Sequence, residues 1–187
     1  RQAYDYSCGS AALTTVLKHY LGQTVDERAA MEGMLEHGEK DKIAERRGFS
    51  LLDMKRYAAA LGFRSAGFRA DIEDLIKLEQ PGIVPITYAN FKHFVVLREY
   101  RDGHFYVADP AIGNISFTTE YFASIWEENV LFLLYPREDT PALNQLQLTD
   151  ADLRIMDMDR FRSDVRMFGA DFTQRWLERA VDTATGA

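Results

Sequence analysis

The apolar pattern of this sequence changes its period once, near residue 83. Before that point apolar residues recur every three or four positions, which predicts amphipathic helices. After it, β-branched and aromatic residues dominate four runs that predict strands, at 83–88, 94–100, 104–108 and 130–135. Asp102-Gly103 predicts a tight hairpin turn between two of them. Helices followed by antiparallel strands predict an α+β fold.

Two of the predicted helices carry their own start and stop signals. The first follows Cys8 and ends before Gly22, which can adopt the left-handed conformation of a helix stop. The second begins after Ser50, where Asp53 three residues later completes a capping box, and it ends before Gly62. Cys8 is therefore expected in the first turn of a buried helix.

The region between these helices is less regular. Residues 26–37 have helical composition but contain Gly33, and residues 40–47 are highly charged. A glycine inside a helix is unfavourable, so we predict a broken helix followed by a loop. A short third helix is expected over residues 71–78.

Composition excludes several classes of partner. The 187 residues are 47% hydrophobic, enough for a real core, and carry a formal net charge of -7. That charge argues against a nucleic-acid partner, which needs clustered Lys and Arg. No apolar run approaches the roughly 20 residues of a membrane-spanning helix, so no membrane span is expected in this chain. Because the sequence starts at Arg1, we expect a signal or anchor upstream.

The sequence beyond Pro136 changes character again. It is polar through Leu148 and then regains helical spacing in five apolar residues, Phe161, Val165, Phe168, Phe172 and Trp176. We therefore divide the chain into a first domain, residues 1–137, and a helical C-terminal extension, residues 138–187. The apolar stripe of the extension either packs on the first domain or binds a partner or a second copy.

Cys8 is the only cysteine, so the chain has no internal disulfide. A lone cysteine on a helix is often just a small buried apolar residue. At the first turn of a helix, however, unpaired N–H groups and the positive helix end favour the thiolate, which is the nucleophilic form. The position predicts an activated sulfur, and Gly9 should leave the neighbouring backbone open to an approaching carbonyl.

His93 is the best candidate for a base beside this thiol. Of the four histidines, only His93 precedes a strand that is followed by a second strand ending in an acid, Asp109. Pairing about the Asp102-Gly103 turn should make the two side chains neighbours, with Asp109 orienting the imidazole. The alternatives are a polar residue at the start of a strand for His93 and a turn former before Pro110 for Asp109.

An acyl-transfer site also needs donors for the developing oxyanion. Gln2, six residues before Cys8, can offer its side-chain amide beside the Cys8 backbone N–H, although a frayed chain start is the alternative. His19, His37 and His104 lack acid partners at a useful spacing, and the sequence contains no zinc-binding motif. No metal and no organic cofactor is expected.

Four motifs, in this order, resemble the peptidase C39 family: Gln2, Cys8-Gly9, His93-Phe94-Val95-Val96 and Asp109-Pro110. Members of this family trim leader peptides after Gly-Gly, and the resemblance covers roughly residues 1–135. It implies a papain-like cysteine peptidase fold in which N-terminal helices pack on an antiparallel sheet. It also implies the roles of nucleophile, base, orienter and oxyanion-hole donor for Cys8, His93, Asp109 and Gln2, respectively.

The sequence departs from the family pattern at two positions. Ser7 stands where the family usually has Asp, and Ser10 where it often has Pro or Ala, which leaves the choice of substrate open. Many members are domains of exporter ATPases, but no Walker-type glycine loop is present here. The chain is similar to stand-alone members, including those that accompany functional-amyloid export systems.

The resemblance implies a specific activity and location. The substrate would be a leader or propeptide with small residues, Gly-Gly, at the cleavage site of an exported protein, and an export apparatus would be a partner. The chain would be periplasmic or secreted, with the cytoplasm as the alternative. Two other functions remain open: a transglutaminase-like acyl transferase, and a catalytically weak peptidase-like module that binds an exported substrate.

Overall fold

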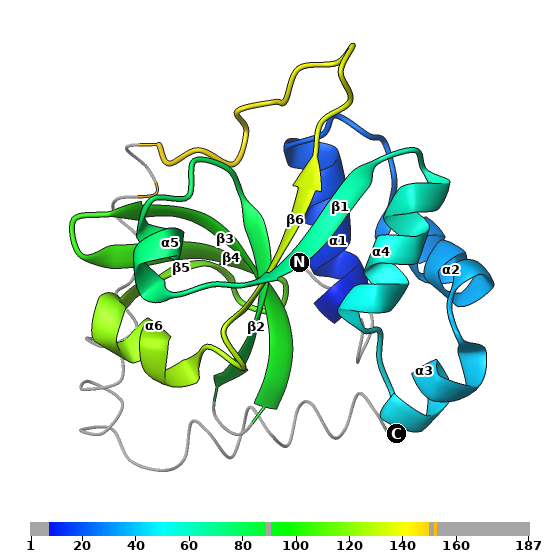
Figure 1. Ribbon diagram of the computed structural model, residues 1–187, viewed down its shortest axis with the longest axis horizontal. Coiled ribbons are helices and arrows are strands. Elements are labelled where there is room, and N and C mark those ends of the chain that lie inside the picture. The colour runs from blue at the N-terminus through cyan, green and yellow to red at the C-terminus, as the bar shows by residue number, and fades with distance from the viewer. Residues whose placement is uncertain (1–7, 89–90, 150–151, 153–187) are drawn as a thin grey trace.

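A computed structural model describes residues 8–88, 91–149 and 152. A six-stranded antiparallel sheet with strand order β1-β6-β2-β3-β4-β5 lies between two groups of helices (Figure 1). The elements in chain order are α1 (Cys8–His19), α2 (Glu27–His37), α3 (Lys40–Arg46), α4 (Leu51–Ala60), β1 (Arg64–Arg69), α5 (Ile72–Ile76), β2 (Gly82–Tyr88), β3 (Phe91–Arg101), β4 (His104–Asp109), β5 (Gly113–Thr118), α6 (Thr119–Ile125) and β6 (Val130–Tyr135). The predicted α+β class with an antiparallel sheet is confirmed.

Each face of the sheet covers its own apolar core. Helices α1, α2 and α4 pack on one face, where Leu13, Val16 and Leu17 of α1 join Val96 of β3. The short helices α5 and α6 pack on the other face around a group of aromatic rings, Phe105, Phe117 and Phe122. Among the helices of the described ranges, none combines the length and apolar character that crossing a membrane requires.

The predicted start and stop signals are confirmed. At α4 the Ser50 hydroxyl accepts the Asp53 N–H at 3.3 Å, and the Asp53 carboxylate accepts the Ser50 N–H at 2.8 Å. Gly22 and Gly62, which follow α1 and α4, have φ of 68° and 82°, the left-handed region that glycine adopts without strain.

The predicted break in the second helical segment is wrong, because α2 runs without interruption through Gly33. A Cβ atom on Gly33 would lie 2.1 Å from Cε2 of Tyr57 in α4. The absence of a side chain therefore lets two helices approach closely. Close packing outweighs the helix-propensity cost of about 1 kcal/mol for glycine.

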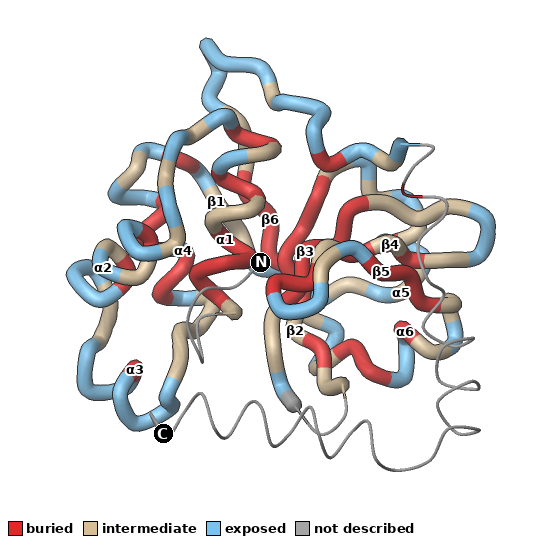
Figure 2. The backbone as a smooth tube through the Cα atoms, turned by 180° about the vertical axis from the view of Figure 1, so that it is seen from behind, coloured by how far each residue is buried: buried red, intermediate tan, exposed pale blue. Residues whose placement is uncertain are grey.

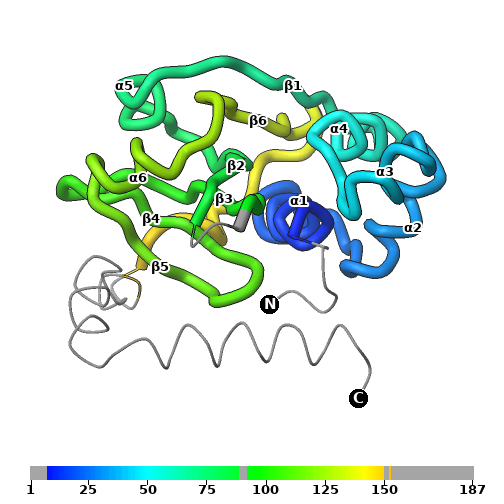
Figure 3. The backbone as a smooth tube through the Cα atoms, turned by 90° about the horizontal axis from the view of Figure 1, so that it is seen from below, coloured from blue at the N-terminus to red at the C-terminus, as the bar shows by residue number. Residues whose placement is uncertain are grey.

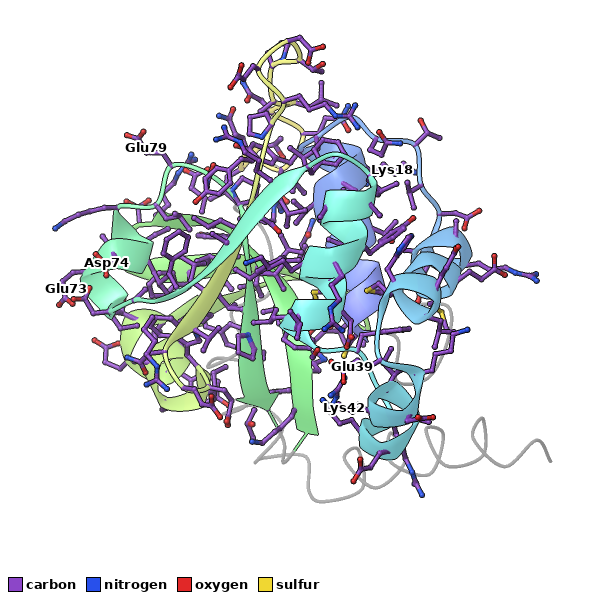
Figure 4. All side chains as sticks on the ribbon, turned by 45° about the vertical axis from the view of Figure 1, so that its right-hand side comes forward. Lys18, Glu39, Lys42, Glu73, Asp74 and Glu79 are labelled. Carbon is purple, nitrogen blue, oxygen red and sulfur yellow. The ribbon has the colours of Figure 1, made fainter. Side chains whose placement is uncertain are left out.

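The predicted charged loop over residues 40–47 is also wrong, because most of it forms α3. Glu39, just before this helix, lies 2.5 Å from Lys42 Nζ and 3.1 Å from an Arg56 nitrogen (Figure 4). Hydrogen bonds from Lys42 and then Arg56 lower the pKa of the Glu39 carboxyl. The Glu39 carboxylate thus links the start of α3 to α4 through ion pairs with Lys42 and Arg56.

The predicted hairpin turn is confirmed by positive φ at both of its residues, 51° for Asp102 and 81° for Gly103. Two strands and, besides α3, one further helix were not predicted. Strands β1 and β5 lie at the two edges of the sheet, and α6 is capped by the Thr118 hydroxyl, which accepts the Tyr121 N–H at 3.3 Å. The apolar stripe predicted between Phe161 and Trp176 lies outside the described residues.

Candidate active site

Cys8 is the first residue of α1, where it lies against the start of β3. The backbone N–H groups of Phe94, Gly9 and Cys8 itself lie near the sulfur and lower the pKa of the thiol, whereas the charge of Asp109 raises it. Phe94 directly follows His93 in β3. The structure therefore places α1, which begins at Cys8, beside the strand that carries the predicted base (Figure 3).

The resting thiol is not activated in the way that its helix position predicts. Burial raises the pKa of Cys8 above its ordinary value, and the negative charge of Asp109 adds to that rise. The three backbone amides lower the pKa but do not outweigh burial. Cys8 therefore holds its proton more firmly than an exposed cysteine does.

Gly9 is closely packed, which differs from the open backbone expected from the sequence. A Cβ atom at this position would lie 2.8 Å from Cε of Met54 and 3.4 Å from Cβ of Phe49. Gly9 is itself buried. The glycine lets the first turn of α1 sit close under α4 and the loop before it.

His93 and Asp109 make a close contact at the predicted place. His93 Nε2 lies 2.9 Å from Asp109 Oδ2, and the two side chains are 13% and 2% exposed. Within the described residues Nε2 has no hydrogen-bond partner of good geometry, so the two atoms are close without an aligned N–H. Catalytic hydrogen bonds often align only when substrate binds.

The strand register explains why these two residues meet. Val96 pairs with Ala108 across β3 and β4, so the next step of the register sets Asp109 opposite Val95. His93 lies two residues further along β3 and hence on the same face as Val95. Diagonal neighbours of this kind are within reach of a long side chain.

Asp109 is also fixed by the turn that follows it. Its Oδ1 atom accepts the backbone N–H of Ala111 at 2.8 Å and of Ile112 at 3.2 Å. The turn-forming alternative and the contact with His93 are therefore both present, one on each carboxylate oxygen. The turn holds Oδ2 toward the imidazole.

The hairpin that carries His93 has a support that sequence reasoning missed. Lys92 Nζ lies 3.2 Å from Glu127 Oε2, and the Glu127 N–H donates to the Pro85 carbonyl at 3.0 Å. Glu127 follows α6, a helix without a strong sequence signal. No local pattern links it to the β2–β3 hairpin.

Two further aspects of the predicted site concern Gln2 and metals. Gln2 and Ser7 lie outside the described residues, so the oxyanion role of Gln2 stays a prediction. In the part of the chain that the structure describes, no three His, Cys, Asp or Glu side chains gather as a metal-binding group. The chemistry at hand is that of a thiol, an imidazole and a carboxylate.

Comparison with known proteins agrees with this arrangement. A model of the peptidase C39 family matches residues 1–138. A protein named "Probable functional amyloid protease FapD" from Pseudomonas aeruginosa is 37% identical over 178 residues, covering 87% of this chain and 77% of that protein. A protein of the same name from Pseudomonas fluorescens is 31% identical over 176 residues, with the same coverage.

Solved structures show the same fold. The peptidase domain of Streptococcus ComA, a bifunctional ABC transporter, superposes with a TM-score of 0.59 at 24% identity, covering 73% of this chain and 96% of that domain. A double glycine motif protease from an AMS/PCAT transporter, solved with its leader peptide, gives a TM-score of 0.53 at 27% identity, covering 73% and 89%. Together with the match over most of the chain, these likenesses show that the protein belongs to the peptidase C39 family of cysteine peptidases.

Proposed function

We propose that this protein is an endopeptidase that cleaves the leader or propeptide of an exported protein after small residues, with Gly-Gly as the preferred pair. Cys8 is the nucleophile, His93 the base and Asp109 its orienter. The observation that carries the proposal is the meeting of α1 and β3, where the Cys8 sulfur lies near the Phe94 N–H and the neighbouring residue, His93, contacts the buried Asp109 at 2.9 Å.

The first step of the mechanism follows from the raised pKa of the Cys8 thiol. Because the thiol keeps its proton in the empty site, His93 must remove that proton as the sulfur attacks the substrate carbonyl. Nε2 faces Asp109, so Nδ1 is the ring nitrogen that receives the proton. The carboxylate of Asp109 then stabilises the imidazolium.

The later steps return that proton. The Cys8 N–H and the Gln2 side chain hold the oxyanion of the tetrahedral intermediate. His93 gives its proton to the leaving amine, and the C–N bond breaks to leave a thioester on Cys8. A water molecule, deprotonated by His93, attacks the thioester and releases the acid product and the thiol.

The choice of substrate is supported by the relatives. One similar structure is described as a double glycine motif protease in complex with its leader peptide. The Lactococcus protein named "Lactococcin-G-processing and transport ATP-binding protein LagD" is 25% identical over 151 residues. These names support a leader peptide as substrate and an export apparatus as partner.

We also propose that the protein acts in the periplasm or outside the cell. The support is its similarity to the proteins named as functional amyloid proteases and to stand-alone C39 members of amyloid export systems. Fractionation of cells that make the native protein tests this, and a purely cytoplasmic protein would contradict it.

The decisive experiment uses synthetic peptides with Gly-Gly, Gly-Ala or Leu-Leu at the centre and mass spectrometry of the products. We expect the wild type to cut after Gly-Gly, and Cys8→Ser to lose at least about 1000-fold in kcat/KM while its circular dichroism is unchanged. Products that carry an added amine would indicate acyl transfer instead of hydrolysis.

Two outcomes would sink the proposal. One is cleavage that survives in Cys8→Ala, because no other thiol exists in the chain. The other is tight binding of Gly-Gly peptides without any cleavage by the wild type, which would identify a binding module.

A further inference from the structure

The chain that follows β6 contacts the peptidase core at several points along its described length. We call residues 136–149 and 152 the C-terminal strap; it lies almost wholly beyond the family match, which ends at residue 138. In Figure 1 the strap is yellow and crosses the end of the molecule away from the dark blue start of α1. Figure 2 shows most of it as exposed. Within residues 136–149 only Leu146 is buried.

On one side the strap holds the far end of α1. The Leu143 N–H donates to the carbonyl of Tyr20 at 2.7 Å, and Gln145 Oε1 lies 3.0 Å from His19 Nδ1. Leu146 is 7% exposed and joins the core between α1 and the sheet. The strap therefore contacts the two residues at which α1 ends.

On the other side it holds the far part of β3 through a buried ion pair. Arg98 donates to both oxygens of Asp152, at 2.6 and 3.1 Å, and to the carbonyls of Leu146 and Gln147, each at 2.9 Å. The two side chains are only 5% and 10% exposed. Bidentate pairs of this kind fix geometry as well as charge.

The ion pair is surrounded by groups that satisfy the carboxylate. Asp152 also accepts from the Thr149 N–H at 2.9 Å, from the Thr149 hydroxyl at 2.7 Å and from Asn114 Nδ2 of β5 at 3.2 Å. Every partner of the Asp152 carboxylate is a hydrogen-bond donor. Both of its oxygens are therefore hydrogen-bonded although the side chain is almost fully buried. A pair satisfied in this way resists displacement by water.

A bulge in β3 presents the side chains that hold the strap. Leu97 pairs with Val107 and Glu99 with Tyr106, so Arg98 is the extra residue in the ladder. Glu99 Oε2 accepts the Leu148 N–H at 3.2 Å, so two consecutive side chains contact the strap. Bulges re-aim side chains in this manner.

The two anchor points are equally far from the catalytic residues. The 12 residues of α1 rise about 1.5 Å each, so His19 lies about 17 Å from Cys8. Five residues of β3, at about 3.3 Å each, set Arg98 about 17 Å from His93. A pocket of about 380 Å³ bounded by Tyr20, Arg98 and Leu143 lies where the strap bridges these far ends.

We propose that the strap is a brace that fixes α1 against β3, and that Arg98 and Asp152 are positioning residues for the approach of Cys8 to His93. Nucleophile and base lie on different elements that pack along one line, so a slip at the far ends changes their separation at the near ends. The inference rests on the proposed peptidase function for its kinetic meaning, although the brace itself is a statement about geometry.

The kinetic test compares Asp152→Asn and Asp152→Glu with the wild type on a Gly-Gly peptide. Asn keeps the size but loses the charge, whereas Glu keeps the charge. We expect Asp152→Asn to lose about 10- to 100-fold in kcat with KM within about twofold, because misplacement costs rate more than binding. Asp152→Glu should retain most of the activity.

A control separates positioning from stability. Gly33→Ala disturbs the α2–α4 contact and leaves the strap untouched. Under conditions in which both Gly33→Ala and the wild type are fully folded, Gly33→Ala should have the wild-type kcat. An equal fall of kcat in Gly33→Ala at the same loss of Tm, or an unchanged kcat in Asp152→Asn, would overturn the brace.

A second readout needs no peptidase activity. Iodoacetamide labelling of Cys8 across pH should shift toward lower pH in Asp152→Asn, because a loosened α1–β3 contact admits water to the thiol. A shifted profile in a protein that cuts no peptide would leave the brace standing and reject the proposed function. Normal cleavage by the wild type together with an unshifted labelling profile in Asp152→Asn would reject the brace and leave the proposed peptidase function standing.

A milder variant covers the case in which Asp152→Asn does not fold. Thr149→Ala removes one hydroxyl donor to Asp152 and leaves no charge unpaired. It should move kcat and the labelling profile in the same directions by a smaller amount. Wild-type values for both quantities would count against the brace.

Discussion

Asp109 is held from two sides by groups that only a carboxylate satisfies together. Oδ1 accepts two backbone N–H groups of the turn, and Oδ2 faces the His93 ring. An amide has one accepting and one donating end, so an asparagine meets one of these demands and fails the other. The turn amides at Oδ1 and the His93 ring at Oδ2 together therefore favour a carboxylate at residue 109.

Asp109→Asn should therefore be nearly as damaging as Asp109→Ala. We expect a loss of about 100- to 10,000-fold in kcat/KM for either variant, because the imidazole loses its orientation or its tautomer. Steady-state kinetics with a Gly-Gly peptide measures this. If Asp109→Asn kept more than about a tenth of the activity, the carboxylate would not be the orienting group.

The thiol makes a separate prediction about pH. Burial raises the pKa of Cys8 and Asp109 adds to it, so alkylation should be slower than for an exposed cysteine at neutral pH and rise through the alkaline range. Asp109→Asn should move this rise to lower pH by removing the negative charge. Fast labelling of the wild type below pH 7, lost in His93→Ala, would instead show a preformed thiolate–imidazolium pair.

At the scale of elements, sequence predicted best what is decided locally. The capping box at Ser50, the Asp102-Gly103 turn and the strand runs depend on neighbours a few residues apart, and they were found. Gly33 was misread because its packing partner, Tyr57, lies in another helix. The edge strands β1 and β5 were missed because each is a short run of mixed polar and apolar residues that contains a glycine.

A substitution at Gly33 tests whether close helix packing or helix propensity has the larger effect on stability. Gly33→Ala should destabilise the protein by about 1–3 kcal/mol, because the clash with the Tyr57 ring exceeds the gain of about 1 kcal/mol in helix propensity. Urea unfolding measures this. Gly67→Ala is the matched control, because nothing lies within 4 Å of a Cβ there, and its effect should stay within about 0.5 kcal/mol.

At the scale of the whole molecule, the site is assembled from α1 and the sheet, and the strap contacts the far ends of α1 and β3. The contact of His93 with Asp109 was predictable because a turn of known type sets the β3–β4 register. The place of Cys8 in the first turn of α1 was predictable from the helical spacing that follows it. The Phe94 amide, Glu127 and the Arg98–Asp152 pair were not, because each depends on contacts between segments far apart in sequence. Local chemistry predicts the reacting groups, and tertiary packing decides how they are held.

The strap should stay in place until strongly acid pH. Hydrogen bonding to Arg98 holds the pKa of Asp152 well below its usual range, despite burial. A depressed folded-state pKa contributes stability that is fully present above the unfolded value of about 3.9 and is lost as the pH falls below it. At pH 5 the backbone amides of residues 143–149 should be protected from hydrogen exchange in the wild type. In Asp152→Asn this protection should be lost early. Equal protection in both proteins would show that the charge does not hold the strap.

The firmly held proton of Cys8 also affects how readily the sulfur is oxidised. Oxidants such as hydrogen peroxide attack thiolates and spare thiols, and the damage becomes irreversible once sulfinic acid forms. The chain has no second cysteine to rescue the first through a disulfide. A sulfur that stays protonated until a substrate arrives is protected from oxidation during that time, so we expect hydrogen peroxide to oxidise Cys8 more slowly than an exposed thiolate.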